Sequence, residues 1–380
     1  SVTATSLDIS GNIDVDGTTN LDIVDVDGAV NFAADVTFAD GADIITASAG
    51  TSNFRAGVNA GNSIASGGNY NTVVGDEAGT AITTADNNTA VGYAAGTAVT
   101  TGVNNVVMGA NAFKTATEGY HTVAIGVNAG DAITTSGQNV LIGYDSGTTV
   151  TTGGDNTAVG DRSLKLTTTG VNNVSIGGTS LENNTTGASN VGVGWSSLRA
   201  NTTASNNTAV GYAAGTAITT ATFNTLIGSL AGDAITTGNN NTGVGYSALG
   251  ATTTGYNHAA LGYGALLNNT TGGNSAAVGR GALHSNTTAD NNVAIGYNSL
   301  YANTTGTGNV AVGKGALDAN TTANYNTAVG LDALGTNTTG TNNNAFGETA
   351  LFSNTTGDNN QAIGRGALEQ NTTADNNSAF

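Results

Sequence analysis

The chain has 380 residues, with 57 Gly, no Pro and no Cys, and only 9% of its residues are charged. An average protein has about 7% Gly and about 25% charged residues, so the composition is that of a repetitive chain rather than of an ordinary enzyme. The lack of Cys excludes disulfides and thiolate metal sites, and a net charge of −18 disfavours binding to nucleic acid or to anionic membranes.

The first 52 residues differ from the rest of the chain. They hold nine acidic residues and no basic one, and short alternating apolar runs, as at Leu7 and Ile9, are separated by Asp-Gly pairs at Asp16, Asp27 and Asp40. Alternation followed by Asp-Gly is typical of short strands joined by tight turns. We therefore interpret residues 1–52 as an acidic, β-rich shaft segment. Two Asp-Val-Asp-Gly stretches begin like a calcium loop but lack its distal Glu, so no metal site is predicted.

Residues 53–380 contain an internal repeat. A Gly that follows a short apolar pair recurs every 17 residues from Gly75 to Gly364, and an imperfect copy at 53–57 is one residue out of step. A fixed period of this length indicates a solenoid, in which each repeat is one coil. We predict about 18 to 19 coils, which at about 4.8 Å each make a rod about 85 Å long. Because the chain begins with Ser1 and stops at Phe380, one residue before the next expected Gly, we expect the natural protein to continue beyond both ends.

The aligned copies define columns, each of which is one position in the coil, and the recurring Gly is called the anchor Gly. Asn is usual four residues before it, and Ala or Ser stands three residues after it, which predicts an Asn ladder and a close approach of neighbouring coils. Thr stands eight residues after the anchor Gly in all 18 copies. The residue directly before the anchor Gly is always a sizeable apolar one, and we predict that this column forms the core; its members include Val91, Ile125, Val159, Val210, Ile227, Ile295 and Val329.

Two columns change together within the chain. When the fourth residue after the anchor is Gly, the seventh is Ile or Val, as in Gly215 and Ile218; when the fourth is Leu, the seventh is Asn or Thr, as in Leu198 and Asn201. The number of large side chains per coil therefore stays at one. This indicates that both positions reach the same interior space, which is filled at native packing density.

No charged residue falls on the strand that ends at the anchor Gly, for example at 207–211. Side chains alternate between the two faces of a strand, so neither face of this strand is adapted to water. One face must line the coil, and we predict that the other meets a second chain. The expected fold is an all-β parallel β-roll or β-solenoid of 17-residue coils, assembled as a side-by-side homotrimer.

The unit Asn-Asn-Thr-Ala-Val-Gly-Tyr-Ala-Ala-Gly at 206–215, and the related copy at 292–296, resemble the head repeat of trimeric autotransporter adhesins. The resemblance covers about residues 53–380 and implies a left-handed β-roll, three chains about one axis, and binding to host surfaces. The acidic opening resembles the shaft segments of tail-fibre proteins of marine bacteriophages, which also carry such rolls. No stalk heptads or membrane-anchor strands of the adhesin type are present in the sequence, which favours the phage fibre.

The resemblance and the columns together predict a non-enzymatic, extracellular fibre without a cofactor, which presents binding to a host-cell glycan or protein and neither binds nucleic acid nor inserts into a membrane. The head of a bacterial surface adhesin is the alternative, and an ice-binding solenoid, suggested by the Thr columns, is a third hypothesis. An outward aromatic column could contact a partner: Tyr93, Tyr144, Trp195, Tyr212, Tyr246, Tyr263 and Tyr297.

Other candidate sites have simpler interpretations. The three His residues, His121, His258 and His284, stand in turn or variable columns and are interpreted as surface substitutions, because no nucleophile, base and orienting group converge on them. Nine Asn-Thr-Thr triplets match glycosylation acceptors, but the repeat alone explains them.

Overall fold

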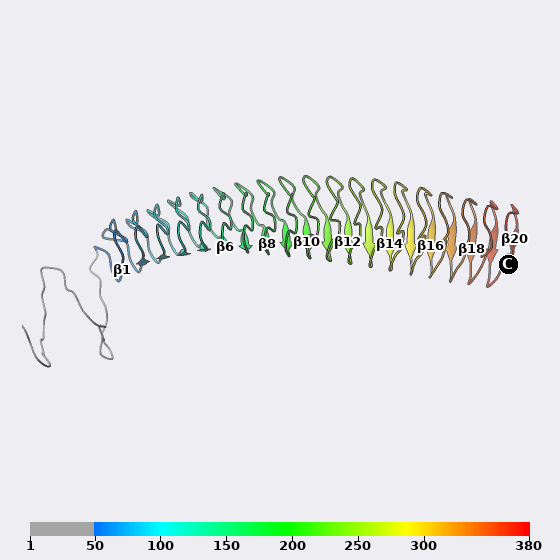
Figure 1. Ribbon diagram of the computed structural model, residues 1–380, viewed down its shortest axis with the longest axis horizontal. Coiled ribbons are helices and arrows are strands. Elements are labelled where there is room, and N and C mark those ends of the chain that lie inside the picture. Colours follow the sequence, from blue (N-terminus) through cyan, green and yellow to red (C-terminus); the bar gives the residue numbers. More distant parts are fainter. Residues whose placement is uncertain (1–48) are drawn as a thin grey trace, which may run out of the picture. The chain divides into compact units, whose positions relative to one another are not determined.

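The computed structural model describes residues 49–380. The acidic segment predicted for residues 1–52 thus lies outside the described residues except for its last four. Residues 49–380 form a regular stack of coils that bends gently along its length (Figure 1). They contain no helix of a length and hydrophobicity that would let it span a bilayer.

Each coil contributes one short strand to a single parallel sheet of twenty strands. In chain order the strands are β1 (Phe54–Ala56), β2 (Thr72–Val74), β3 (Thr89–Val91), β4 (Val106–Met108), β5 (Val123–Ile125), β6 (Val140–Ile142), β7 (Thr157–Val159), β8 (Val174–Ile176), β9 (Val191–Val193), β10 (Thr208–Val210), β11 (Thr225–Ile227), β12 (Thr242–Val244), β13 (Ala259–Leu261), β14 (Ala276–Val278), β15 (Val293–Ile295), β16 (Val310–Val312), β17 (Thr327–Val329), β18 (Asn344–Phe346), β19 (Gln361–Ile363) and β20 (Ser378–Ala379).

Every strand pairs with the next one along the chain, and the register confirms the period read from the sequence. Thr208 of β10 pairs with Thr225 of β11, an offset of 17 residues, whereas Phe54 of β1 pairs with Thr72 of β2, an offset of 18. The first coil therefore holds the extra residue that puts its copy out of step. The predicted all-β parallel β-solenoid of 17-residue coils is confirmed.

The interior of the coil is lined by the middle residue of each strand, not by the residue before the anchor Gly. Ala209 is fully buried, whereas its neighbour Val210 is partly exposed, and Ile227 and Ile295 are 41% and 42% exposed. Since successive side chains of a strand point to opposite faces, only one of the two columns can face inward. The predicted core column is thus wrong for the single chain. All of its named members lie on the outside of the sheet: Val91, Ile125, Val159, Val210, Ile227, Ile295 and Val329.

Most of the large side chains of the interior come from the two columns that change together, as predicted; the others include Leu141 and Leu226, the middle residues of β6 and β11. A Cβ placed on Gly232 would lie 2.8 Å from Cδ1 of Ile235, and one on Gly79 would lie 2.7 Å from Cδ1 of Ile82. Both distances are shorter than ordinary packing contacts. The Ile side chain thus fills the space that a Leu takes in other coils, which explains why a coil carries one or the other.

The Asn column forms the predicted ladder, and its members are buried. Asn207 donates its backbone N–H to Oδ1 of Asn190 at 3.0 Å and its side-chain amide to the carbonyl of Ala221 at 2.8 Å. The next coil repeats the bond, from the N–H of Asn224 to Oδ1 of Asn207. Buried amides cost free energy when they are unpaired. The ladder provides hydrogen-bond partners for both the Asn side chains and the backbone groups of the turn, and it links each coil to its neighbours.

The anchor Gly lies where the chain turns away from the sheet. Its φ is between 123° and 140° in every coil from Gly57 to Gly364, a region that L side chains rarely adopt. A Cβ on Gly211 would also meet the carbonyl oxygen of Gly228 in the next coil at 2.5 Å. Both backbone conformation and stacking therefore require Gly at this position.

Candidate functional site

The outer sheet face consists of the first and third side chains of each strand, which point away from the coil interior. It carries no charged residue from β1 to β20, and its exposed members include Met108, Ile176, Leu261 and Phe346, of which Leu261 is 50% exposed. Most of its residues are Val, Ile or Thr, which suit a flat pleated surface. A continuous, uncharged and largely apolar surface of this kind is typical of a protein interface.

The ion pairs lie away from the outer sheet face, in the columns one, two and five residues after the anchor Gly. Glu182 binds Arg199 at 2.9 Å and Arg162 at 3.3 Å, and Lys165 binds Asp145 at 3.0 Å. Burial by itself would raise the pKa of Asp145, but hydrogen bonds from Asn128 and Lys165 lower it. Apart from Arg55 in β1, the charged side chains of the described coils thus lie on the turns.

The aromatic column predicted to contact a partner lies on the outside, two residues past the end of the strand. Each of its members is between 45% and 57% exposed: Tyr93, Tyr144, Trp195, Tyr212, Tyr246, Tyr263 and Tyr297. Neighbours in successive coils stack, with ring centroids 5.3 Å apart for Trp195 and Tyr212 and 5.4 Å apart for Tyr246 and Tyr263. Tyr93 and Tyr144 have no aromatic neighbour in this column and stand alone.

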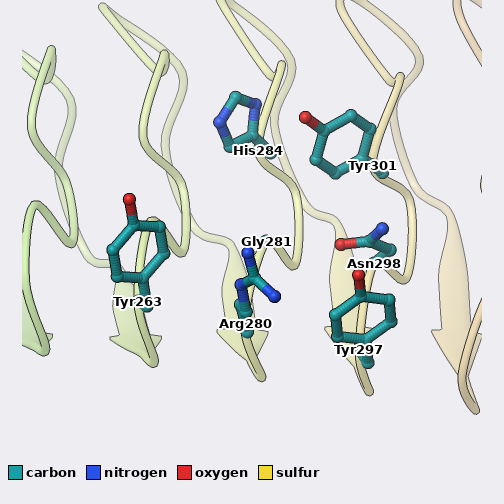
Figure 2. A pocket seen from close by; sticks show the side chains of 7 residues that line it. All are labelled: Tyr263, Arg280, Gly281, His284, Tyr297, Asn298 and Tyr301. Carbon is teal, nitrogen blue, oxygen red and sulfur yellow. The ribbon is translucent and has the colours of Figure 1, made fainter.

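Arg280 occupies the same column between two of these tyrosines. Its guanidinium carbon lies 5.6 Å from the ring centroid of Tyr263 and 5.7 Å from that of Tyr297, within cation–π range of both. Above them, His284 and Tyr301 stack with their centroids 4.7 Å apart. The two rows line a shared hollow of about 150 Å³. Figure 2 shows their side chains. The sequence offered one signal for this site, Tyr, Arg and Tyr in consecutive copies of one column.

His258 is not the surface substitution that we predicted. It replaces Asn in the buried ladder and is 2% exposed; its Nε2 lies 2.7 Å from the carbonyl oxygen of Gly272, and its Nδ1 accepts the N–H of Ser275 at 3.4 Å. The carbonyl can only accept, so Nε2 carries the proton. Burial lowers the pKa of His258, because it disfavours the charged form. The ring therefore substitutes for an Asn amide, in its neutral state.

His121 and His284 differ from His258. His121 is exposed and lies edge-on to Tyr120, with ring centroids 5.4 Å apart, as a surface residue would. His284 is half-buried, and burial lowers its pKa. Within residues 49–380, no three His, Cys, Asp or Glu side chains gather as a group that could hold a metal ion.

The Asn of each Asn-Thr-Thr triplet points into the coil. Asn201 donates to Oδ1 of Asn184 at 2.8 Å and to the carbonyl of Ala204 at 3.1 Å, and both Asn side chains are fully buried. A buried, hydrogen-bonded amide is not presented to a glycosylating enzyme by the folded chain. Only Asn371, in the last coil, is partly exposed.

The Thr column eight residues after the anchor Gly is half-buried and serves the stack. Thr202 donates its hydroxyl to the carbonyl of Thr219, and Thr219 to that of Thr236, each at 3.2 Å. The Thr that follows each of them, such as Thr203, is exposed. Of the two adjacent Thr columns, only the second thus faces water, so the ice-binding hypothesis has a single row of exposed Thr residues to rely on.

Comparison of the chain with protein-family models, with curated proteins and with solved structures found no match.

Proposed function

We propose that the chain is the shaft of an extracellular fibre of the bacteriophage tail-fibre type, in which three copies lie side by side. The observation that carries the proposal is the outer sheet face, an uncharged surface that runs through all twenty strands. A monomer in water rarely keeps so continuous an apolar surface uncovered.

Copies of the same chain are the best partner for this surface. The strand spacing and the order of Val, Ile and Thr repeat every 17 residues, so an identical chain can match it coil for coil over its full length. A globular partner would cover only a few coils and leave the rest wet. The three-fold arrangement is the one implied by the resemblance to adhesin head repeats.

A fibre role also agrees with the shape and the surface chemistry. A stack of coils separates its two ends, as a spacer between an anchor and a receptor-binding end must (Figure 1). The net charge of −18 repels the phosphates of nucleic acid and of anionic lipid headgroups, so neither is proposed as a partner. The proposed partner of the assembled fibre is a glycan or a protein of the host-cell surface, and no enzymatic step or cofactor is proposed.

The second candidate is the head of a bacterial surface adhesin, in which the roll itself binds the partner. The exposed aromatic column favours it, because stacked Trp and Tyr side chains are common in recognition surfaces. In this case binding activity would be found in the coils and not at an end of the fibre.

The solution mass tests the proposal directly. Light scattering on the full chain should give three times the 37.0 kDa of one protomer, and small-angle scattering should show a rod no longer than one chain. A monomer at micromolar concentration would refute the fibre assembly, and a dimer would keep the side-by-side contact but refute the three-fold arrangement.

A further inference from the structure

Three successive coils build a hollow on the surface, which we call the Arg280 hollow. Tyr263, Arg280 and Tyr297, each two residues past the end of strands β13, β14 and β15, form one side, and His284 and Tyr301 form the other (Figure 2). Gly281 and Asn298 line it between the two rows. All seven residues that line it belong to one chain, so the site does not depend on assembly.

Arg280 has no carboxylate partner among the described residues, although the chain carries 26 acidic residues against eight basic ones. Arg162, Arg199 and Arg365 all have one. The rings of Tyr263 and Tyr297 hold the guanidinium between them, and no hydrogen bond within the described part of the chain uses its N–H groups. A fork of N–H donors held in this way matches a carboxylate, which it can bind with two parallel hydrogen bonds.

The space beside Arg280 exists because two successive coils have Gly at the position two residues after the anchor. A Cβ on Gly281 would meet Oδ1 of Asn298 at 2.6 Å, and one on Gly264 would meet only the ring of His284, at 3.7 Å. Asp145 and Arg162, in the equivalent positions of other coils, place charged side chains there. The Gly pair thus opens the hollow and lets the amide of Asn298 reach into it.

The opposite row adds two stacked rings, those of His284 and Tyr301. Nδ1 of His284 is itself buried, so the imidazole contributes a ring wall and not a hydrogen-bonding atom. The hollow therefore offers a cation, an amide and aromatic walls within about 150 Å³. This is below the roughly 300–1,000 Å³ typical of small-molecule pockets, so it suits one sugar-sized unit.

We propose that the Arg280 hollow binds one carboxylate-bearing sugar unit of a surface polysaccharide, with the carboxylate on Arg280 and a ring hydroxyl on Asn298. As a ligand class for surface attachment, the inference rests on the proposed function, in which the fibre contacts a glycan of the host-cell surface. It requires only a single carboxylate at Arg280, unlike the dense phosphates that the net charge of −18 repels. As a binding site, it stands within a single chain and can be tested on its own.

The test is a titration of the full chain with methyl glucuronide, methyl glucoside and inorganic phosphate as separate probes. Binding of the two sugars is detected by NMR saturation transfer. We expect weak binding of the glucuronide and none of the neutral glucoside. Arg280→Gln should weaken glucuronide binding about tenfold or more, since charge-assisted hydrogen bonds are lost. Arg280→Lys should weaken it as well, because the ammonium group lacks the planar fork.

Lys314→Gln is the matched control. Lys314 is a cation in the same column two coils further on, where Leu331 replaces one flanking tyrosine, and it lines no part of the hollow. Its loss should leave the glucuronide affinity unchanged. If Arg280→Gln melts below the unmodified chain, Tyr297→Leu serves as the second variant, and it should weaken binding by removing one wall.

Three results would overturn the inference. These are no glucuronide binding by the unmodified chain, equal losses in Arg280→Gln and Lys314→Gln, and phosphate binding as tight as that of the glucuronide, which would indicate a general anion site. The solution mass separates this outcome from that of the fibre proposal. A monomer that binds glucuronide keeps the site and refutes the fibre, and a trimer that does not bind it does the reverse.

Discussion

Asn190 and Asn201 donate their side-chain amides to the same carbonyl oxygen, that of Ala204, at 2.8 and 3.1 Å. The two residues belong to different ladders, one at the turn before the strand and one on the far side of the coil. The turn ladder continues past Asn190, but the second ladder ends at Asn201, whose Oδ1 has no partner because Ile218 follows it in the next coil. One column of the coil can thus hold either an Asn that continues the ladder or an Ile that fills the interior, but not both.

This competition predicts strong coupling between Leu198 and Asn201. Leu198→Gly should cost about 2–5 kcal/mol of unfolding free energy as a cavity forms, less about 1 kcal/mol because Leu198 has a left-handed φ of 50° that suits Gly. Asn201→Ile should cost about 1–3 kcal/mol by overpacking. The double variant recreates the pair Gly215 and Ile218, so it should cost about 1–3 kcal/mol less than the sum. Denaturant melts of the four chains measure the difference.

The same double change at Leu300 and Asn303 is the control. Asn303 lies inside the longer ladder and accepts the amide of Asn320 at 2.8 Å, so its replacement leaves that neighbour without its acceptor. We expect a greater loss of stability there than at Leu198 and Asn201. Strictly additive costs at the first site would show that the two side chains do not share one space.

His258 makes stability depend on pH. Its pKa in the folded chain lies below the usual 6.5, because burial disfavours the imidazolium. Above about pH 6.5 the ring is neutral in both states, but below it the unfolded chain takes up a proton that the folded chain resists. Stability should therefore fall as the pH falls from about 6.5 towards the folded-state pKa.

Melts between pH 5 and 8 of the unmodified chain and of His258→Asn check this prediction. Asn is the usual residue of the ladder, so the variant should lose that part of the pH dependence and remain folded. His284, whose pKa is also lowered, stays in both chains and cancels in the comparison. Parallel pH profiles for the two chains would contradict the assignment of the effect to His258.

Adjacent strand residues should respond to the same substitution in opposite ways. Ala209→Asp puts an unpaired carboxylate in the coil interior, so the chain should unfold or lose several kcal/mol of stability. Val210→Asp puts it on the outer sheet face, where a single chain tolerates it but a packed assembly does not. Circular dichroism and light scattering should show a folded but dissociated Val210→Asp chain. A variant that keeps its trimer mass would exclude this face as the interface.

The anchor Gly allows stacking and backbone strain to be separated. Gly211→Ala brings a Cβ within 2.5 Å of the carbonyl of Gly228, whereas in the last coil a Cβ on Gly364 meets nothing within 4 Å. Both positions have φ above 120°. Gly364→Ala should cost about 1–3 kcal/mol at most, from strain alone, and Gly211→Ala should cost clearly more. Similar melting of the two variants would mean that stacking does not select Gly here.

The repeat explains which features were predictable. The period, the parallel stack, the Asn ladder and the sharing of one space by residues such as Gly215 and Ile218 are all written in columns that can be compared within the chain. The columns do not show which of two neighbours, Ala209 or Val210, faces inward, because both are apolar and alternation permits either choice. Size favoured Val210 as the core residue, but at this point the coil is too narrow for more than Ala in most copies.

The Arg280 hollow and the burial of His258 could not be predicted from the sequence, for two different reasons. Arg280 and His284 stand four residues apart in sequence, and their relation depends on how the coil folds between two columns, which an alignment of copies does not show. His258 stands in a polar column, which suggested the surface. Polar side chains are nonetheless buried there, because each amide bonds to the coils before and after it.

Because the strands pair in a constant register, the length of the stack changes only by whole 17-residue coils. Deleting any 17 consecutive residues between β2 and β19 removes one rung, joins equivalent positions and leaves both the ladders and the outer sheet face continuous. Recombination between copies can therefore lengthen or shorten the rod in steps of about 4.8 Å without designing a new interface. Reach becomes a trait that can vary between close relatives while the cross-section stays the same.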